Sequence, residues 1–421
     1  MNIWLVNHHA NPPHEPGDAR HYSHARELMR RGHDVRVVAC NFDHIRHKHL
    51  PIATGRTWEN DELQGVPFTM IAACAYDTNF EVARIRNMFE FALRARKLDW
   101  AYGLAAPNLV LGSTPDPFAA LAAERIAAHY GVPFLLEVRD AWPFVFTEIG
   151  NISPHHPFVV LVDKVMRYLY KRAARIIMFS RNSRDLLVRY GAAPDKIVWI
   201  SHGVDLSFNP EPRPRTNDGQ FTITYLGAHN TWNSLDAVLD AAKIVQRSGA
   251  SNITFRFVGD GESKPALVSR VASEGIANVR FDDPVPKSQV TEVKHNSDAF
   301  IINNRPDAVS KHWMSFNKLF DYMSAGRPVV FGTHTDNNPV LESGGGISVE
   351  ADNIEELARG VLSLAKLPAD ELREMGMRGR RHITEHYSIP KLVDRFEQVA
   401  IESLGREVVS RAGCAPIGEC Q

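Results

Sequence analysis

The sequence has few of the features that define several large classes of protein. Its 421 residues include only 4 cysteines, too few for a disulfide framework, so a reducing compartment is expected. No apolar run approaches the roughly 20 residues of a membrane-spanning helix, and the chain opens on the strand-like segment 1–6 instead of a signal peptide. The net charge is -1, which gives no general attraction to nucleic acid. An ordinary soluble, cytoplasmic enzyme is therefore expected.

Several catalytic signatures are also missing. The chain has no Walker loop, no His-Glu-x-x-His, no Gly-x-Ser-x-Gly and no pair of aspartates spaced to chelate a metal. Covalent nucleophilic catalysis and divalent-metal catalysis have no visible support. We therefore expect neither a metal nor another cofactor.

What the chain does contain is a regular alternation of apolar, strand-like runs and helical patterns. In the first half the runs are 3–7, 35–39, 68–72, 109–112, 134–138, 176–179 and 197–200. In the second half they are 221–226, 254–258, 279–281, 299–302, 329–331 and 347–349. Such alternation predicts α/β architecture, with parallel sheets and right-handed crossovers.

The proline-rich, polar segment 209–219 interrupts the alternation and is typical of an exposed linker. We predict two doubly wound, Rossmann-like domains, at 1–208 and 220–387, facing each other across a cleft. A helix is predicted at 388–405 and a loose tail at 406–421. Ligands of such sheets bind beyond the carboxyl ends of the strands, so we expect the site in the cleft.

The segment 315–331 is the most informative part of the chain. It predicts a helix that Asn317 caps, with Lys318 and Asp321 near its start, and that Gly326 ends in the left-handed conformation before Pro328. The free N–H groups of a helix start favour a phosphate, and a carboxylate one turn on can accept hydrogen bonds from sugar hydroxyls. This combination points to a nucleotide-diphosphate site.

Two further loops of the second domain follow strands and are expected at the same edge of its sheet. Taken alone, each is a weak signal, because a turn explains such a loop more often than a ligand does. Together with 315–331 they converge on one site, to which they add Gly227, His229, Asn230, Gly259, Gly261 and Glu262.

In the first domain, the long loop after the first strand is predicted to contact substrate. It contains Gly17, where backbone can approach a ligand closely, followed by Arg20 and His21 at the start of a helix. The alternative is that its histidines only solvate a loop, and a metal site is disfavoured because their spacing matches no zinc pattern. Arg139 and Asp140 follow a buried strand and are either used in catalysis or paired with each other to tie two loops.

In this order, the landmarks resemble those of the family 4 retaining glycosyltransferases of the GT-B fold, along nearly the whole chain. The segments that carry the resemblance are 12–17, 32–35, 203–205, 258–261 and 319–330. Residues 20–22, 139–143 and 317–318 look closest to the branch that builds bacterial surface polysaccharides, which includes aminosugar transferases.

The resemblance implies transfer of a sugar, with retention, from a nucleotide-diphosphate sugar in the second domain to an acceptor on the first. A UDP-linked donor, an N-acetylaminosugar among the candidates, and a glycan or polyprenyl-diphosphate-linked acceptor are expected. It also implies that the final helix crosses back to the first domain. Catalytic roles fall on Asp140, Arg139 and His21, phosphate binding on Lys318, and ribose binding on Asp321.

The chain departs from the family pattern at three points. Trp313 stands where the first of two paired acids is usual, and Arg139 where a histidine is often found. No arginine or lysine follows Gly227 closely, where Ala228, His229 and Asn230 stand instead.

Two helical patterns, at 82–98 and 157–175, combine an apolar stripe with flanking arginines and lysines. Core-facing helices have the same pattern, and the alternative is docking on the inner face of the cytoplasmic membrane. Two other functions also remain open: a nucleotide-sugar 2-epimerase and a non-catalytic sugar-nucleotide-binding protein.

Overall fold

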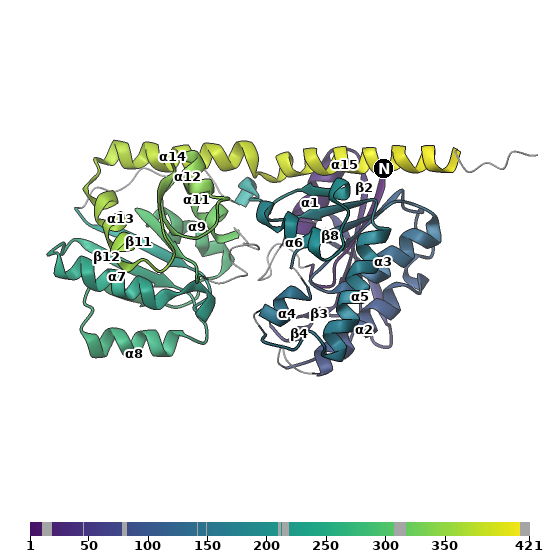
Figure 1. The fold of residues 1–421 in the computed structure, drawn as a ribbon, viewed down its shortest axis with the longest axis horizontal. Coiled ribbons are helices and arrows are strands. Elements are labelled where there is room, and N and C mark those ends of the chain that lie inside the picture. The colour runs from purple at the N-terminus through teal and green to yellow at the C-terminus, as the bar shows by residue number, and fades with distance from the viewer. Residues whose placement is uncertain are drawn as a thin grey trace, which may run out of the picture. The chain divides into compact units, whose positions relative to one another are not determined.

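A computed structural model describes residues 1–10, 19–44, 46–77, 82–140, 142–148, 150–208, 212, 219–306 and 317–412, with side chains as far as 405. The chain divides into two compact units, each with its own sheet (Figure 1). The first unit comprises Met1–Ser201 and Leu392–Gln421, and the second comprises His202–Lys391. The predicted linker at 209–219 lies within the second unit, and most of it falls outside the described residues.

The sheet of the first unit has the strand order β10-β9-β8-β7-β1-β2-β6-β5. All neighbours are parallel except the edge pair of β5 and β6. Strands such as β7 and β8 are buried at every position, as expected when helices cover both faces. The strands are β1 (Asn2–Val6), β2 (Asp34–Cys40), β5 (Trp58–Leu63), β6 (Val66–Ile71), β7 (Leu109–Ser113), β8 (Phe134–Val138), β9 (Arg175–Met178) and β10 (Ile197–Trp199).

Helices and short turns connect these strands. Helix α3 shows why one begins where it does, since Asp116 accepts a hydrogen bond from the N–H of Phe118, Pro117 opens the helix and Gly131 ends it with φ of 62°. Helix α3 packs between α2 and α5. The elements are α1 (Arg20–Arg30), a ribbon of β3 (Phe42–Asp43) and β4 (Lys48–His49), α2 (Val82–Ala95), η1 (Asp99–Ala101), α3 (Pro117–Tyr130), α4 (Phe144–Glu148), α5 (Pro157–Arg172), η2 (Arg181–Ser183), α6 (Arg184–Arg189) and η3 (Pro194–Lys196).

The sheet of the second unit is parallel throughout, in the order β13-β12-β11-β14-β15-β16. Its strands are β11 (Phe221–Leu226), β12 (Ile253–Val258), β13 (Val279–Asp282), β14 (Ala299–Asn303), β15 (Val329–Gly332) and β16 (Gly346–Val349). The other elements are η4 (Leu206–Phe208), η5 (Thr231–Asn233), α7 (Leu235–Arg247), α8 (Lys264–Glu274), α9 (Lys287–His295), α11 (Asn317–Ser324), α12 (Pro339–Ser343), α13 (Ile354–Lys366) and α14 (Ala369–His386). The predicted α/β class with two Rossmann-like sheets is confirmed.

The strand orders locate where a ligand should bind. Counted along the chain, the second sheet runs 3-2-1-4-5-6, so the order reverses between β11 and β14. In the first sheet the corresponding reversal lies between β1 and β7. Open α/β sheets bind ligands outside the carboxyl ends of the strands at such a switch point.

The final helix, α15 (Ile389–Ala412), begins in the second unit and belongs to the first from Leu392 onward. In the first unit, Glu397 pairs with Arg31 and lies 2.6 Å from Nε2 of His33, and Glu402 lies 3.3 Å from Arg175. The prediction of a loose tail from 406 is wrong at its start, because the helix continues to Ala412. Within the described residues, no helix is both long and apolar enough to cross a membrane.

Candidate functional site

Two glycine-containing loops pack backbone to backbone at the carboxyl ends of β11 and β12. A Cβ atom on Gly259 would lie 2.1 Å from the carbonyl oxygen of Gly227, and one on Gly261 would lie 2.3 Å from that of His229. Gly259 and Gly261 also have φ angles of +144° and +156°, which side chains rarely permit. These glycines are therefore needed for the close approach of the two loops beside the switch point.

His229 and Asn230 lie in the first of these loops. The ring of His229 is buried among Tyr225, Phe257 and Phe281, with centroid distances of 5.9 to 6.3 Å. Neither of its nitrogens has a hydrogen-bond partner in the part of the chain that the structure describes. Burial, followed by the charge of nearby Lys264, lowers the pKa of His229 to about 4, so the ring is neutral at physiological pH.

Lys318 reaches from α11 across the loop that follows β11. Its Nζ donates a hydrogen bond of 2.7 Å to Oδ1 of Asn233 and lies 5.4 Å from the ring centroid of Tyr225. Its Cε would be 2.6 Å from a Cβ placed on Gly227. Burial lowers the pKa of Lys318 to about 8, and no carboxylate within the described residues forms an ion pair with it. A half-buried cation bonded only to a neutral amide favours an anionic ligand.

The same helix presents Asp321 and Tyr322. The Tyr322 hydroxyl donates to the carbonyl of Leu226 and accepts from its N–H, each at 2.7 Å, which fastens α11 to the end of β11. Oδ1 of Asp321 lies 3.0 Å from Nζ of Lys294, a buried lysine on α9. Because residues 318, 321 and 322 are three and four positions apart, their side chains share one face of α11.

The remaining predicted residues of this unit are less engaged. Glu262 is exposed in the loop after β12, and Asn230 accepts a hydrogen bond of 2.6 Å from Asn233. Asn317 is exposed and is the first residue of α11, so it stands inside the helix and not before it as predicted. Gly326 has the predicted left-handed conformation, with φ of 63°. Trp313, like Gly17 of the first unit, lies outside the described residues.

In the first unit, Glu137 is the centre of a buried polar cluster at the β1/β7 switch point. Its carboxylate lies 3.0 Å from Nε of Arg20 and 3.1 Å from Nε2 of His21, and it accepts a 2.8 Å hydrogen bond from Ser113. The ring of His21 is also 3.0 Å from the amide nitrogen of Asn7. Burial disfavours the carboxylate, but Arg20 and His21 hold the pKa of Glu137 well below its usual range.

This cluster explains why two predicted site residues, Arg20 and His21, are buried. Arg20 and His21 are 5% and 2% exposed, and pairing with Glu137 accounts for both without a ligand. Their predicted roles toward substrate stay predictions. Glu137 was not predicted from the sequence, although a carboxylate inside an apolar strand is itself a signal, since a buried charge needs a partner.

Arg139 and Asp140 lie half-buried just beyond β8. Their backbone N–H groups donate to the hydroxyl of Thr114 at 2.8 and 3.4 Å, which ties this loop to the one after β7. The guanidinium of Arg139 lies 5.7 Å from the ring centroid of Phe179. Burial raises the pKa of Asp140. Both side chains are therefore held beside the switch point of the first sheet, where a substrate is expected.

A second buried pair supports the loop that follows β1. Nδ1 of His8 lies 2.5 Å from Oδ2 of Asp116, and the ring of His8 stacks between His9 and Phe91 at 4.5 and 4.6 Å. Burial disfavours the His8 cation, but Cys40 and Asp116 outweigh it and raise the pKa of His8 to about 10. The pair fixes the start of the long loop.

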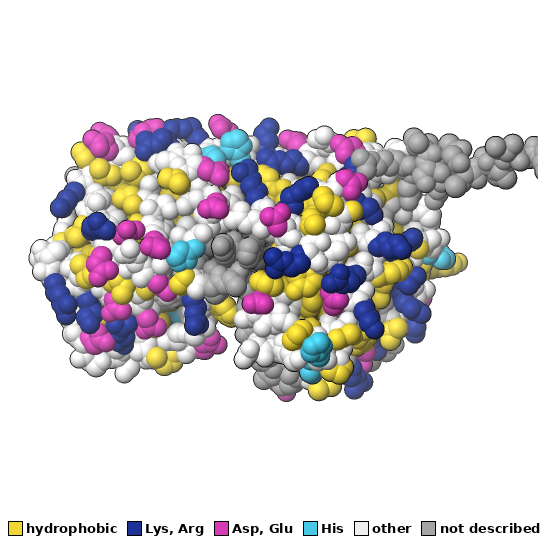
Figure 2. Space-filling view, in the orientation of Figure 1, with side chains coloured by type: hydrophobic (Ala, Val, Ile, Leu, Met, Phe, Trp, Pro, Cys, Tyr) yellow, Lys and Arg dark blue, Asp and Glu magenta, His cyan; other side chains and the backbone are white. Residues whose placement is uncertain are grey.

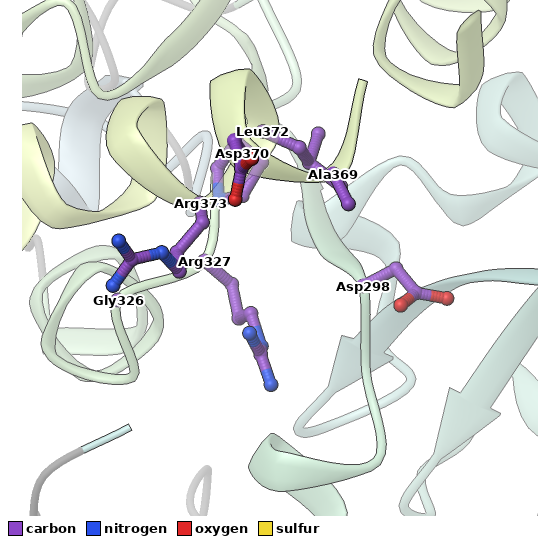
Figure 3. Close-up of a pocket in the computed structure, with 8 residues that line it drawn as sticks. Asp298, Gly326, Arg327, Ala369, Asp370, Leu372 and Arg373 are labelled. Atoms are coloured by element: carbon purple, nitrogen blue, oxygen red, sulfur yellow. The ribbon is translucent and has the colours of Figure 1, made fainter. Parts of the chain in front are cut away.

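A pocket of about 280 Å³ lies at the other end of the second sheet, beside the amino ends of β14 and β15 (Figure 3). Its charged residues are Asp298, Arg327, Asp370 and Arg373, whose charged ends point in different directions in Figure 3. The glycine loops and Lys318 lie at the carboxyl ends of the strands, so this pocket is separate from the candidate site.

Two Rossmann-like units, joined by a final helix that runs from the second into the first, define the GT-B class of glycosyltransferases. The family model described as Glycosyltransferase Family 4 matches residues 21–208, and that described as Glycosyl transferases group 1 matches residues 220–366. The chain belongs to the family 4 glycosyltransferases.

Solved structures agree with this assignment of the fold. HepE from Anabaena, solved with UDP and glucose, is 12% identical with a TM-score of 0.66, over 96% of this chain and 100% of that one. Sucrose-phosphate synthase from Thermosynechococcus elongatus is 12% identical with a TM-score of 0.67, over 99% and 100%. TarM from S. aureus, solved with UDP among its ligands, is 10% identical with a TM-score of 0.62, over 95% and 99%. The comparison with curated protein sequences found no match.

Proposed function

We propose that this glycosyltransferase moves a sugar, with retention, from a UDP-sugar to a glycan or lipid-linked acceptor in polysaccharide biosynthesis. The observation that carries the proposal is Lys318, a half-buried cation at the β11/β14 switch point whose hydrogen-bond partner among the described residues is the neutral amide of Asn233. A diphosphate would supply the missing negative charge. HepE and TarM were solved with UDP, which supports uridine as the base.

The phosphate site would combine one full charge with backbone dipoles. Lys318 lies over Gly227, where the absence of a side chain leaves room for the stem of the lysine to cross the loop. Asp321, half exposed on the same face of α11, would accept hydrogen bonds from the ribose hydroxyls.

The main requirement of the reaction is stabilisation of the leaving group. Negative charge accumulates on the departing diphosphate as the anomeric bond breaks, and Lys318 is positioned to stabilise it. In front-side transfer the leaving phosphate helps to remove the proton of the acceptor hydroxyl, so neither a protein nucleophile nor a metal is required. Asp140 and Arg139 would orient the acceptor or the donor sugar from the first unit, and His21, bonded to Glu137, would support them.

The first unit, which would bind the acceptor, exposes apolar and basic side chains on two of its helices. Helices α2 and α5 expose Val82, Leu93 and Leu161 at 81%, 52% and 40%, and the exposed Lys164 and Lys171 lie on α5. Figure 2 shows basic and hydrophobic side chains next to each other over this part of the first unit. We infer peripheral docking on an anionic cytoplasmic leaflet, where each basic residue near the surface contributes about 1 kcal/mol. Such docking suits an acceptor linked to polyprenyl diphosphate.

One experiment tests the proposed reaction. The full chain is incubated with a panel of UDP- and other nucleotide sugars, with and without lipid-linked acceptor, and with EDTA in a parallel series. Acceptor-dependent release of UDP that persists in EDTA, with an axial-to-axial or equatorial-to-equatorial product by NMR, supports the proposal. Donor epimerised without acceptor would indicate a 2-epimerase, and binding without turnover a non-catalytic protein.

Membrane docking is tested separately. The chain should float with vesicles that contain anionic lipid at 0.1 M salt and detach as salt rises, because screening shortens the range of attraction. The double variant Lys164→Glu, Lys171→Glu should lose this flotation, whereas Lys366→Glu, an exposed position of the second unit, should keep it. Equal flotation of all three proteins would refute docking through α5.

A further inference from the structure

We propose that Lys294 is a positioning residue that holds the carboxylate of Asp321 in the orientation needed to bind the ribose of the nucleotide. The proposal rests on the proposed function, because it concerns the same nucleotide site. It assigns a role to a lysine on α9 that no sequence pattern marked. The contact on which it depends joins two residues that are 27 positions apart.

The two partners differ sharply in exposure. The side chain of Lys294 is 5% exposed, whereas that of Asp321 is 49% exposed, with 3.0 Å between Nζ and Oδ1. The bond therefore anchors the carboxylate from the protein side and leaves its remaining surface open to water. A carboxylate has about four lone-pair positions, so a single N–H bond leaves enough of them for the two hydroxyls of a ribose.

The backbone under Asp321 is already fixed. Tyr322 is fully buried, stacks on Phe300 at 4.3 Å and makes two hydrogen bonds to Leu226 at the end of β11. Helix α11 thus has a defined position relative to the sheet, and the freedom that remains at Asp321 is rotation about its side-chain bonds. An anchor on one oxygen removes that freedom before the nucleotide arrives, which reduces the entropy lost on binding.

The stability gained from the contact with Asp321 does not by itself account for a buried lysine at this position. Burying an ammonium group is costly, and replacing buried ionic groups with apolar side chains of similar size is often neutral or stabilising. The partner here is half exposed and would be solvated by water without Lys294.

The experiment measures how well the site recognises the ribose hydroxyls. Binding of UDP, of 2′,3′-dideoxy-UDP and of inorganic diphosphate is measured by calorimetry on the full chain. Hydrogen bonds to a charged group are strong, so UDP should bind about 10- to 150-fold more tightly than its dideoxy analogue. Asp321→Asn should reduce this ratio to about 3-fold or less.

The test variant is Lys294→Met, which keeps the length of the apolar stem and removes the charge. Its UDP-to-dideoxy ratio should fall close to that of Asp321→Asn, while its affinity for inorganic diphosphate stays within about 2-fold of the unaltered chain. Lys294→Gln retains an N–H donor and should keep more of the ratio, which guards against a folding defect in one variant. Lys243→Met, which removes a lysine paired with Glu274 on the surface, is the matched control and should change neither value.

The outcomes separate this inference from the proposed function. A Lys294→Met protein that still discriminates between the two nucleotides as well as the unaltered chain overturns the positioning role alone. A variant that loses diphosphate affinity as strongly as UDP affinity also overturns it, because the lysine would then act as a general charge. An unaltered chain that does not bind UDP overturns the proposed nucleotide site together with the inference.

Discussion

The substitution Lys318→Met should weaken binding of UDP without unfolding the protein. The ammonium group lies over Gly227 and makes one 2.7 Å hydrogen bond, to the amide of Asn233. A charge-assisted hydrogen bond to phosphate contributes about 1.5–3 kcal/mol, which corresponds to a Kd about 10- to 150-fold higher in the variant. Uridine, which has no phosphate, should bind both proteins equally.

The pKa of Lys318 gives the same prediction a signature in pH. In the free protein burial lowers it to about 8, whereas a bound diphosphate would favour the charged form. Above pH 8 the protein must take up a proton to bind UDP, so its Kd should rise by up to about tenfold per pH unit. The Lys318→Met protein has no such group and should show a flat profile across this range.

The stability of the free protein changes with pH in the opposite direction to its affinity for UDP. The folded pKa of about 8 is below the value for an unfolded lysine, so between those two values the unfolded chain binds more protons. Stability in the absence of ligand should therefore rise across that window, and this increment should vanish in the variant.

Calorimetry with UDP and uridine from pH 7 to 9.5 is the assay, with Lys243→Met as the control. An unchanged Kd and pH profile in the Lys318→Met protein would refute the assignment of Lys318 to phosphate.

Three further substitutions test the surrounding framework. Glu137→Gln should destabilise the first unit by about 3–5 kcal/mol in urea denaturation, because it removes the carboxylate that pairs with the buried Arg20, while UDP affinity is kept. Equal stability would contradict the buried-charge argument. Gly259→Ala should cost about 1–3 kcal/mol through overpacking and weaken UDP binding, whereas the control Gly249→Ala has no atom within 4 Å of its new Cβ and should leave binding unchanged. The pair of His8 and Asp116 should stabilise the fold fully below the unfolded histidine pKa of 6.5, and this stabilisation should be lost as pH rises through about 10. Denaturation of the Asp116→Asn variant should lack that pH dependence. A variant that keeps it would show that the pH dependence comes from another group.

Much of the fold could be predicted because buried parallel strands are continuous apolar runs. The predicted strands 134–138 and 221–226 coincide with β8 and β11, since each run is bounded by turn residues and has no competing helical period. The edge strand β5 was not predicted, because four of its six residues are polar; it pairs antiparallel at the margin of the sheet. The two-residue strands β3 and β4 are too short to leave a pattern.

Part of the candidate site follows from local sequence patterns, and the rest depends on contacts between residues far apart in the sequence. The glycine loops and the face of α11 could be predicted, because positive φ angles and helical spacing are properties of short segments. Glu137, Lys294 and Asn233 could not, since their roles depend on contacts with residues 24 to 117 positions away. Arg20 was predicted to meet a ligand, and its burial against Glu137 is visible only once β8 and α1 are packed together.

Lys318 also bears on the clearest departure from the family pattern, the absence of a basic residue in the loop after Gly227. An electrostatic site depends on where a charge lies in space and not on which segment carries it. In this chain Nζ of Lys318 comes from α11 and bonds to Asn233, a residue of that loop, 85 positions earlier in the sequence. The loop thus has no cation in its own sequence, but the folded chain places Lys318 beside it. Its attachment to α11 also places it on the same helix face as Asp321, so in the proposed site the recognition of phosphate and of ribose would both depend on the position of a single helix.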